Sequence, residues 1–276
     1  MTITLRAGAF ACEVEPALGG SLLSLTQRGQ DLLRQAPAGT TNVLEAACFP
    51  LVPFANRIAH GRFRFEGENI VLPPDPAALP HAHHGQGWRG AWQIARQTED
   101  CATLVFAHAP GDWPWRYEAT QTILLDETGI SLTLELANRD HRVMPAGLGL
   151  HPFFPRGLET AIVTTAHRMV TTGPDDIPDG EAAFEPGPRS LAALEGLDNL
   201  LLGGGDAIAF EDGPGSVRLA ASGPLAGWHC YVPLGKDFFC IEPVTHRPDS
   251  FRDQRSSERL EPGGSCRLAL RIEPSA

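Results

Sequence analysis

The chain has 276 residues, of which 42% are hydrophobic and 20% are charged, a composition typical of a soluble globular protein with a large core. The net charge of −11 argues against nucleic acid and anionic membranes as partners. No apolar run approaches the roughly 20 residues that span a bilayer, and the first ten residues lack the basic start and apolar block of a secretion signal.

The six cysteines are scattered along the chain and show no CxxC spacing. This distribution favours reduced and mostly buried thiols over disulfides or a zinc site. We therefore expect a cytoplasmic protein.

Alternation of apolar and polar residues is the dominant pattern, and glycines and prolines are spread throughout the chain. It predicts strands at residues 2–6, 21–25, 102–108, 120–125, 130–136, 207–210, 217–220 and 267–272. The turn residues Asp126-Glu127-Thr128-Gly129 predict a hairpin between two of them.

Helix signals are few. Leucines in residues 190–202 come close to a helical period, but nearby glycines weaken that interpretation. Residues 72–80 and 173–188 are rich in proline and predict long surface loops. The simplest fold is all-β: one large antiparallel β-sandwich, forming a single domain over residues 1–276.

Residues 237–250 contain one carboxylate in an apolar strand. Alternation puts Phe238, Cys240 and Glu242 on one face, and Pro243 follows at once. An apolar setting raises the pKa of a carboxyl group and makes it a base that acts near neutrality. The alternative is an ordinary acid at a strand end that faces solvent or an arginine.

Residues 49–58 surround Asn56 and Arg57 with large apolar residues and prolines, so Arg57 is expected to be partly buried. A buried guanidinium needs acceptors, which a ligand or the protein itself can supply. A structural ion pair and a ligand contact both remain open here.

Residues 81–92 place His81, His83 and His84 just ahead of Gly85 and Gly87. Clustered histidines can bind metal, but no glutamate of the cupin pattern follows, and no Cys or His pair completes a zinc set. We expect neither a metal nor a cofactor. The glycines instead let the backbone approach a partner beside His84; the alternative is a loop histidine with a satisfied hydrogen bond.

Residues 146–154 put Gly147, Gly149 and His151 on one strand face. A face cleared of side chains suits a ligand that lies flat on the sheet, although a single glycine could also mark a bulge. Pro152 favours an extended His151, as Pro243 does for Glu242, so both candidates are expected at strand ends.

Asp198 is the lone charge in the leucine-rich residues 197–201. Taken by itself, this position favours a helix cap.

These segments together resemble the aldose 1-epimerases, or galactose mutarotase-like proteins, over most of the chain. The matching elements, in family order, are Asn56-Arg57-Ile58, His84-Gly85 with Trp92 downstream, His151-Pro152-Phe153 and Glu242-Pro243. The resemblance implies a large antiparallel β-sandwich of the supersandwich type, with a sugar bound on its concave face.

The resemblance also implies roles for these residues and a small-molecule sugar as partner, without cofactor or metal. The implied catalytic groups are Glu242 as general base, His151 as general acid, and His84, which orients the sugar and shares the acid role. The implied substrate-binding residues are Arg57, Asn56 and Asp198. Trp88, Trp228 or Phe153 could stack on the sugar, with core packing as the alternative for each.

Galactose-specific members of the family usually carry a second glycine where this chain has Gln86, which disfavours galactose as the natural substrate. A hexose-phosphate 1-epimerase is one alternative function, with Arg62, Arg64, Arg89 and Arg247 as a candidate phosphate clamp. A non-catalytic sugar-binding protein of the same fold is another. A monomer or a homodimer is expected.

Overall fold

Two large antiparallel sheets make up most of the protein in a computed structural model, which describes residues 1–213, 215–252 and 258–275. The eleven-stranded sheet has the order β1 (Ile3–Ala7), β2 (Phe10–Glu15), β3 (Ser21–Gln27), β5 (Cys48–Leu51), β15 (Gly149–Pro155), β24 (Phe238–Val244), β23 (Gly227–Tyr231), β20 (Asp198–Leu202), β17 (Arg168–Thr172) and β18 (Pro178–Ala183), with β4 (Gln30–Asp31) paired to β3. The nine-stranded sheet has the order β10 (Gln93–Gln97), β11 (Cys101–His108), β12 (Tyr117–Asp126), β13 (Gly129–Asn138), β26 (Ser265–Pro274), β22 (Gly215–Ser222), β21 (Ala207–Asp212), β16 (Ala161–Thr164) and β19 (Gly187–Ser190).

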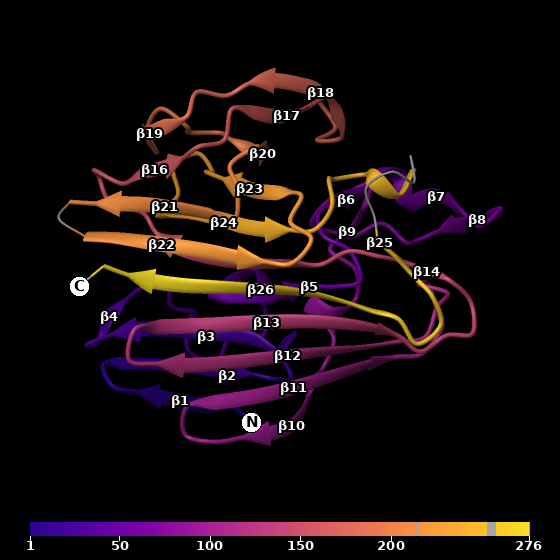
Figure 1. The fold of residues 1–276 in the computed structure, drawn as a ribbon, viewed down its shortest axis with the longest axis horizontal. Coiled ribbons are helices and arrows are strands. Elements are labelled where there is room, and N and C mark those ends of the chain that lie inside the picture. Colours follow the sequence, from indigo (N-terminus) through magenta and orange to yellow (C-terminus); the bar gives the residue numbers. More distant parts are fainter. Residues whose placement is uncertain (214, 253–257, 276) are drawn as a thin grey trace.

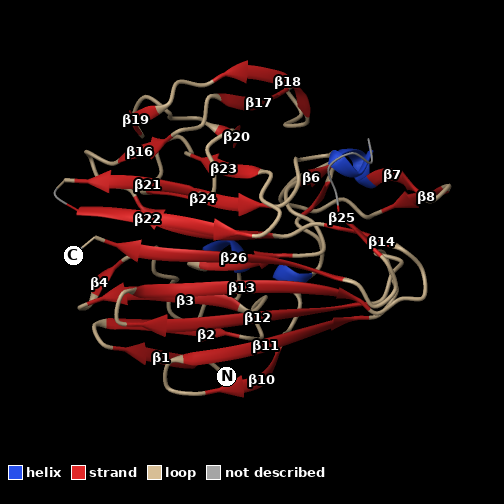
Figure 2. Ribbon diagram, in the orientation of Figure 1, coloured by secondary structure: helices blue, strands red, loops and turns tan. Residues whose placement is uncertain are grey.

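The remaining elements are short. Three two-stranded ladders pair β6 (Arg57–Ile58) with β9 (Ala82–His83), β7 (Arg62–Phe65) with β8 (Glu68–Val71), and β14 (Met144–Ala146) with β25 (Glu258–Leu260). The 3₁₀ turns are η1 (Val43–Glu45), η2 (Ala59–Gly61), η3 (Gly87–Arg89) and η4 (Ser250–Arg252). Strands dominate the described chain (Figure 2), so the all-β prediction is confirmed.

Each strand that alternation predicts is present; the first is shifted by one residue to Ile3–Ala7, and the others are longer than predicted by a few residues. The predicted hairpin is β12–β13, in which Asp126 pairs with Gly129 across the turn. Two predictions are wrong. Residues 190–202 form turns and then β20 rather than a helix, because their apolar side chains pack on both faces of a sheet. Residues 173–188 contain β18 and the start of β19 within the predicted loop.

The two sheets stack face to face, as Figure 1 shows, and the main core lies between them. Phe154 of β15 packs against Phe210 of β21 with ring centroids 4.9 Å apart, and Phe210 packs against Phe239 of β24 at 5.1 Å. These contacts cross from one sheet to the other. The large antiparallel β-sandwich predicted from the pattern is therefore present.

The opposite face of the eleven-stranded sheet is also covered. A second apolar cluster lies on it, formed by residues such as Phe49, Leu51, Leu200 and Cys240. Because strands buried on both faces lose the clean polar and apolar alternation, β5, β15 and β24 are nearly continuous runs of buried residues.

Five of the six cysteines are buried and Cys101 is partly exposed, in line with the mostly buried thiols that the sequence predicts. Within the described ranges, no helix has the length and apolarity needed to cross a membrane.

Candidate active site

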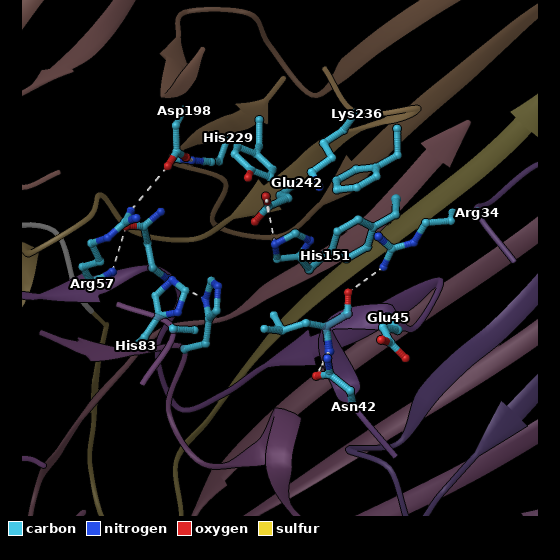
Figure 3. Close-up of a pocket in the computed structure, with 17 residues that line it drawn as sticks. Arg34, Asn42, Glu45, Arg57, His83, His151, Asp198, His229, Lys236 and Glu242 are labelled. Atoms are coloured by element: carbon cyan, nitrogen blue, oxygen red, sulfur yellow. Dashed lines mark hydrogen bonds and ion pairs between the residues drawn. The ribbon is translucent and has the colours of Figure 1, made fainter. Parts of the chain in front are cut away.

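A pocket opens over the second face of the eleven-stranded sheet. Its volume is about 490 Å³, within the range of roughly 300–1,000 Å³ typical of small-molecule sites. The pocket is lined by Arg34, Asn42, Leu44, Glu45, Asn56, Arg57, Ala77, His83, His84, His151, Phe153, Asp198, His229, Tyr231, Lys236, Phe238 and Glu242 (Figure 3). All six site residues predicted from the sequence are among them: Asn56, Arg57, His84, His151, Asp198 and Glu242.

Glu242 and His151 face each other across neighbouring strands. The register that pairs Gly149 with Val244 and Phe153 with Cys240 brings His151 opposite Glu242, and His151 Nε2 lies 3.4 Å from Glu242 Oε1. Both residues are inside their strands, β15 and β24, so the expected position at strand ends is wrong. His151 pairs with Phe49 of β5 and Glu242 pairs with His229 of β23, so a neighbouring strand holds the backbone of each.

Burial sets the protonation of this pair. It raises the pKa of the Glu242 carboxyl to about 8 and lowers the pKa of the His151 imidazole to about 3. Between these pH values the two groups hold one proton, and it resides on Glu242, since a carboxylic acid beside a neutral imidazole carries no charge. The contact is a neutral pair rather than a salt bridge near pH 7.

The glycines ahead of His151 do not clear space for a ligand. A Cβ at Gly147 would lie 1.9 Å from the His246 ring, and one at Gly149 would lie 2.9 Å from Leu51 Cδ1. The protein's own side chains occupy that face, so the expectation of a bare sheet surface is wrong. The glycines permit close packing of the strands that carry the pocket.

The Asn56 and His84 loops are held to each other by reciprocal hydrogen bonds. The Asn56 amide N–H donates to His84 Nδ1, and the His84 amide N–H donates to the Asn56 carbonyl, each over 3.0 Å. Both residues have a left-handed backbone, with φ of 60° and 56°, a conformation found often at functional sites. Since Nδ1 of His84 accepts, its proton is on Nε2, and burial keeps the pKa of this imidazole well below 6.5. His84 is thus a neutral donor.

Gly85 next to His84 explains the close backbone approach predicted there. Its φ is 71°, and an added Cβ would lie 2.4 Å from the Val52 carbonyl oxygen. The partner that approaches is the protein's own residue 52 rather than a ligand.

Asp198 joins two pocket residues. Its Oδ1 lies 2.7 Å from His229 Nε2 and its Oδ2 lies 3.6 Å from Arg57 Nη1, while Arg57 also pairs with Asp176 at 3.1 Å. Arg57 has an exposed side-chain fraction of 14%, so it is partly buried and ion-paired, as one of the two open interpretations predicts. Asp198 begins β20 and caps no helix, so the cap prediction is wrong.

His229 is a pocket residue that the sequence analysis missed. It lies opposite Glu242 in the ladder between β23 and β24. Burial opposes its charged form, but the hydrogen bond and charge of Asp198 outweigh burial and raise the pKa of His229. A histidine alternating with Gly227 and Tyr231 in an apolar strand is the signal that could have found it.

Of the aromatic residues considered for stacking, Phe153 lines the pocket and stacks on the His151 ring, with centroids 4.5 Å apart. Trp88 and Trp228 are buried outside the pocket lining. Their core interpretation is the correct one.

The candidate phosphate clamp is not assembled. None of its four arginines lines the pocket that contains Glu242. Arg89 makes a bidentate pair with Asp75 beside a different cavity, Arg247 pairs with Glu181, and Arg62 lines a third cavity.

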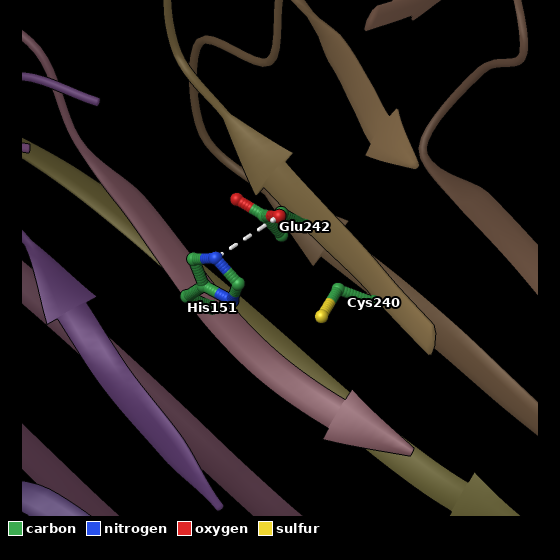
Figure 4. A group of neighbouring side chains, drawn as sticks. All are labelled: His151, Cys240 and Glu242. Atoms are coloured by element: carbon green, nitrogen blue, oxygen red, sulfur yellow. Dashed lines mark ion pairs between the residues drawn. The ribbon is translucent and has the colours of Figure 1, made fainter. Parts of the chain in front are cut away.

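Cys240 completes a group of possible metal ligands. Its sulfur, one nitrogen of His151 and one oxygen of Glu242 all lie within 4.8 Å of one another (Figure 4). Zinc accepts this type of donor set, but it requires a thiolate, and burial raises the pKa of Cys240 well above 9. Cys240 is fully buried in the apolar cluster under the pocket, in line with the expectation of mostly buried thiols.

The fold and the pocket define a β-sandwich protein with a buried carboxyl and imidazole pair. The family model for aldose 1-epimerases matches residues 1–273, and the chain belongs to this family. Its relatives include YphB of Escherichia coli (strain K12), an uncharacterised protein that is 30% identical over 298 residues and aligns over 99% of each chain.

Solved structures agree. A crystal structure of a candidate aldose 1-epimerase from Escherichia coli K12 has a TM-score of 0.92 and 26% identity, covering 100% of this chain and 99% of that chain. A galactose mutarotase-like protein from Clostridium acetobutylicum has a TM-score of 0.85 at 18% identity, covering 99% and 95%. The galactose mutarotase-like fold is thereby established.

Proposed function

We propose that this protein is an aldose 1-epimerase that interconverts the α and β anomers of an aldose by opening and closing the sugar ring. The observation that carries the proposal is the buried pair of Glu242 and His151, 3.4 Å apart in a pocket of sugar-accommodating size. Membership of the aldose 1-epimerase family supports it.

The reaction needs two proton transfers and no covalent intermediate. Opening a cyclic hemiacetal removes a proton from the anomeric hydroxyl O1 and delivers one to the ring oxygen O5 as the C1–O5 bond breaks. Rotation about C1–C2 and closure with the proton roles reversed then gives the other anomer. Each positioned acid or base contributes roughly 10²–10⁴-fold, which suffices for a reaction that already proceeds slowly in water.

The single proton that Glu242 and His151 share near neutral pH is the number of protons that ring opening moves between them and the sugar. Ring opening requires Glu242 as carboxylate at O1 and His151 as imidazolium at O5, and it leaves a carboxylic acid and a neutral imidazole. That product state is the one burial favours in this pocket. The sugar hydroxyls must therefore supply the hydrogen bonds that stabilise the charged form before opening.

The other predicted residues would hold the sugar. His84, a neutral donor at Nε2, would orient a hydroxyl or the ring oxygen, which leaves the acid role to His151. Arg57 and Asp198, already paired with each other, would bind hydroxyls as donor and acceptor. Asn56 lines the same pocket.

The test is anomer exchange measured by polarimetry and exchange NMR on freshly dissolved α-anomers of several aldoses. We expect acceleration by the wild-type protein and a loss of about 10²-fold or more in Glu242→Gln and in His151→Asn. Rates unchanged by both substitutions contradict the mechanism. If no aldose is accelerated, a non-catalytic sugar-binding protein replaces the enzyme as the better interpretation.

A further inference from the structure

Lys236 is the only lysine in the chain, since all other members of its 22 lysines and arginines are arginines. It lies in the connection between β23 and β24 and lines the pocket, with its side chain directed inward from the rim (Figure 3). Among the described residues, no carboxylate forms an ion pair with its ammonium group. An unpaired cation at a pocket rim, in a chain of net charge −11, is suited to an anionic ligand.

Arg34 reinforces this end of the pocket. Its guanidinium lies over the Phe153 ring, 3.8 Å from the centroid, and 4.6 Å from that of Phe238. Nη2 donates to the carbonyl oxygens of Leu44 at 2.7 Å and Ala46 at 2.6 Å. Backbone carbonyls and aromatic faces hold this charge in place, and no carboxylate of the described chain forms an ion pair with it.

Two carboxylates lie near Arg34 without forming an ion pair with it. Glu45 lines the pocket and accepts a hydrogen bond from the Thr40 hydroxyl, and Asp237 does not line the pocket. Both add negative charge near Arg34, and neither is paired with Lys236. At the other end, Arg57 is neutralised by Asp198 and Asp176. The pocket cations that have no ion-pair partner among the described residues are therefore Arg34, beside Phe153 and Phe238, and Lys236.

The positions of the pocket side chains from Glu242 to Arg34 indicate which part of a bound sugar would lie beside Arg34 and Lys236. Glu242 is 3.4 Å from His151, the His151 ring stacks on Phe153, and Arg34 lies over Phe153. If Glu242 serves O1 and His151 serves O5, then C5, which is bonded to O5, lies past His151. Its substituent C6 then extends over Phe153 toward Arg34 and Lys236.

The donors favour a singly charged group over a phosphate. Arg34 uses Nη2 for two carbonyls, and its Nε is enclosed away from solvent, so the exposed Lys236 ammonium is the more accessible donor for a ligand. One ammonium balances one negative charge, whereas a phosphate usually requires several forked or backbone donors.

We propose that Lys236, supported by Arg34, binds an acidic group at C6, so that the preferred substrate is a hexuronate, an aldose that carries a carboxylate at C6. This inference rests on the proposed anomerase activity, and it names the substrate class for that site.

The test compares kcat/KM by exchange NMR for matched sugars: glucuronate against glucose, galacturonate against galactose, and glucose 6-phosphate. The wild-type protein is expected to prefer the uronate over its neutral partner by about 10-fold or more, the value of a charge-assisted contact. In Lys236→Met this selectivity ratio falls about 10-fold, and Lys236→Arg restores most of it. Arg96→Met, which removes an exposed charge on β10, leaves the ratio unchanged and serves as the control for net charge.

The outcomes separate the two proposals. Acceleration of neutral hexoses and uronates to the same extent, or a ratio insensitive to Lys236, overturns the hexuronate inference while the anomerase proposal stands. A preference for glucose 6-phosphate over every uronate also overturns it. Absence of acceleration with any sugar is a failure of the proposed function itself.

Discussion

The two faces of the eleven-stranded sheet are built from the same strands, but one face forms the main core and the other forms the pocket. On β24, Phe239 and Ile241 face the main core, while Phe238, Cys240 and Glu242 face the pocket or the apolar cluster beneath it. The first face is apolar and interlocked with the second sheet. The second face combines an apolar cluster with buried titratable groups. Neighbouring residues of one strand can therefore serve the stability of the core and the chemistry of the pocket separately.

The largest expected effect lies on the core face. Phe239→Ala removes a ring that is fully buried against Phe154 and Phe210, and it is expected to lower the free energy of unfolding by about 3–5 kcal/mol. Phe238→Ala, the neighbouring residue on the half-buried pocket face, is the matched control and should cost clearly less. Urea denaturation of both variants checks this difference, and equal losses contradict the distinction between the faces.

Glu242→Gln should stabilise the fold at neutral and high pH while lowering the activity. The unfolded carboxyl loses its proton near pH 4.5, but the folded one keeps it until about pH 8, so folding stability falls as pH rises through this window. One pKa unit corresponds to about 1.4 kcal/mol. The variant should match the wild type near pH 4.5 and exceed it by a few kcal/mol at pH 9, as measured by urea denaturation at both pH values. A constant difference across this range would falsify the burial argument.

Asp198→Asn tests the charge network of the pocket face. It removes the carboxylate that holds Arg57 and His229, and hydrogen bonds to charged groups contribute roughly 1.5–3 kcal/mol each. We expect kcat/KM for anomer exchange to fall about 10–100-fold, together with a lower melting temperature, because His229 and Arg57 lose a charged partner. A variant that loses stability but keeps its kcat/KM would instead assign Asp198 a structural role.

The pH profile of kcat/KM reports the shared proton. Above about pH 8 the pair loses its only proton, since His151 is already neutral, and no acid remains for O5. The rate should be level from pH 5 to 7 and then fall about tenfold per pH unit. A rate that continues to rise through pH 9 contradicts the assignment.

The smallest expected effect is that of a chelator. Because Cys240 and Glu242 keep their protons near neutral pH, prolonged incubation with EDTA should leave the anomerisation rate unchanged. A loss that Zn²⁺ restores would instead assign His151, Cys240 and Glu242 as metal ligands.

Local sequence patterns predicted the strands of this fold better than they predicted which side chains pack around the pocket residues. Alternation alone placed Glu242 and Phe238 on one strand face, and the structure confirms it. It could not reveal that side chains from distant segments, His246 and Leu51, fill the space over Gly147 and Gly149. A contact between residues 90 or more positions apart cannot be predicted from the pattern of a single segment.

The same limit explains the errors on charged residues. The sequence indicates that Arg57 needs acceptors, but only the fold brings Asp176 and Asp198 to it. The sequence makes Arg89 a candidate phosphate ligand, but in the fold its guanidinium donates two hydrogen bonds to Asp75. His229 and Lys236 were missed, although a lone lysine among arginines is visible in the sequence. The single domain over residues 1–276, the oligomeric state and the cytoplasmic location stay predictions.

The most direct test of the central claim is a double-mutant cycle on the pocket face. Anomer exchange is measured by NMR for Glu242→Gln, His151→Asn and the double variant, each checked for an intact fold by circular dichroism. If the two groups act as one proton-sharing unit, each single substitution costs about 10²-fold or more, and the double variant is no more than a few-fold slower than the slower single variant. Losses that multiply in the double variant, or a single variant that keeps the wild-type rate, would contradict the account.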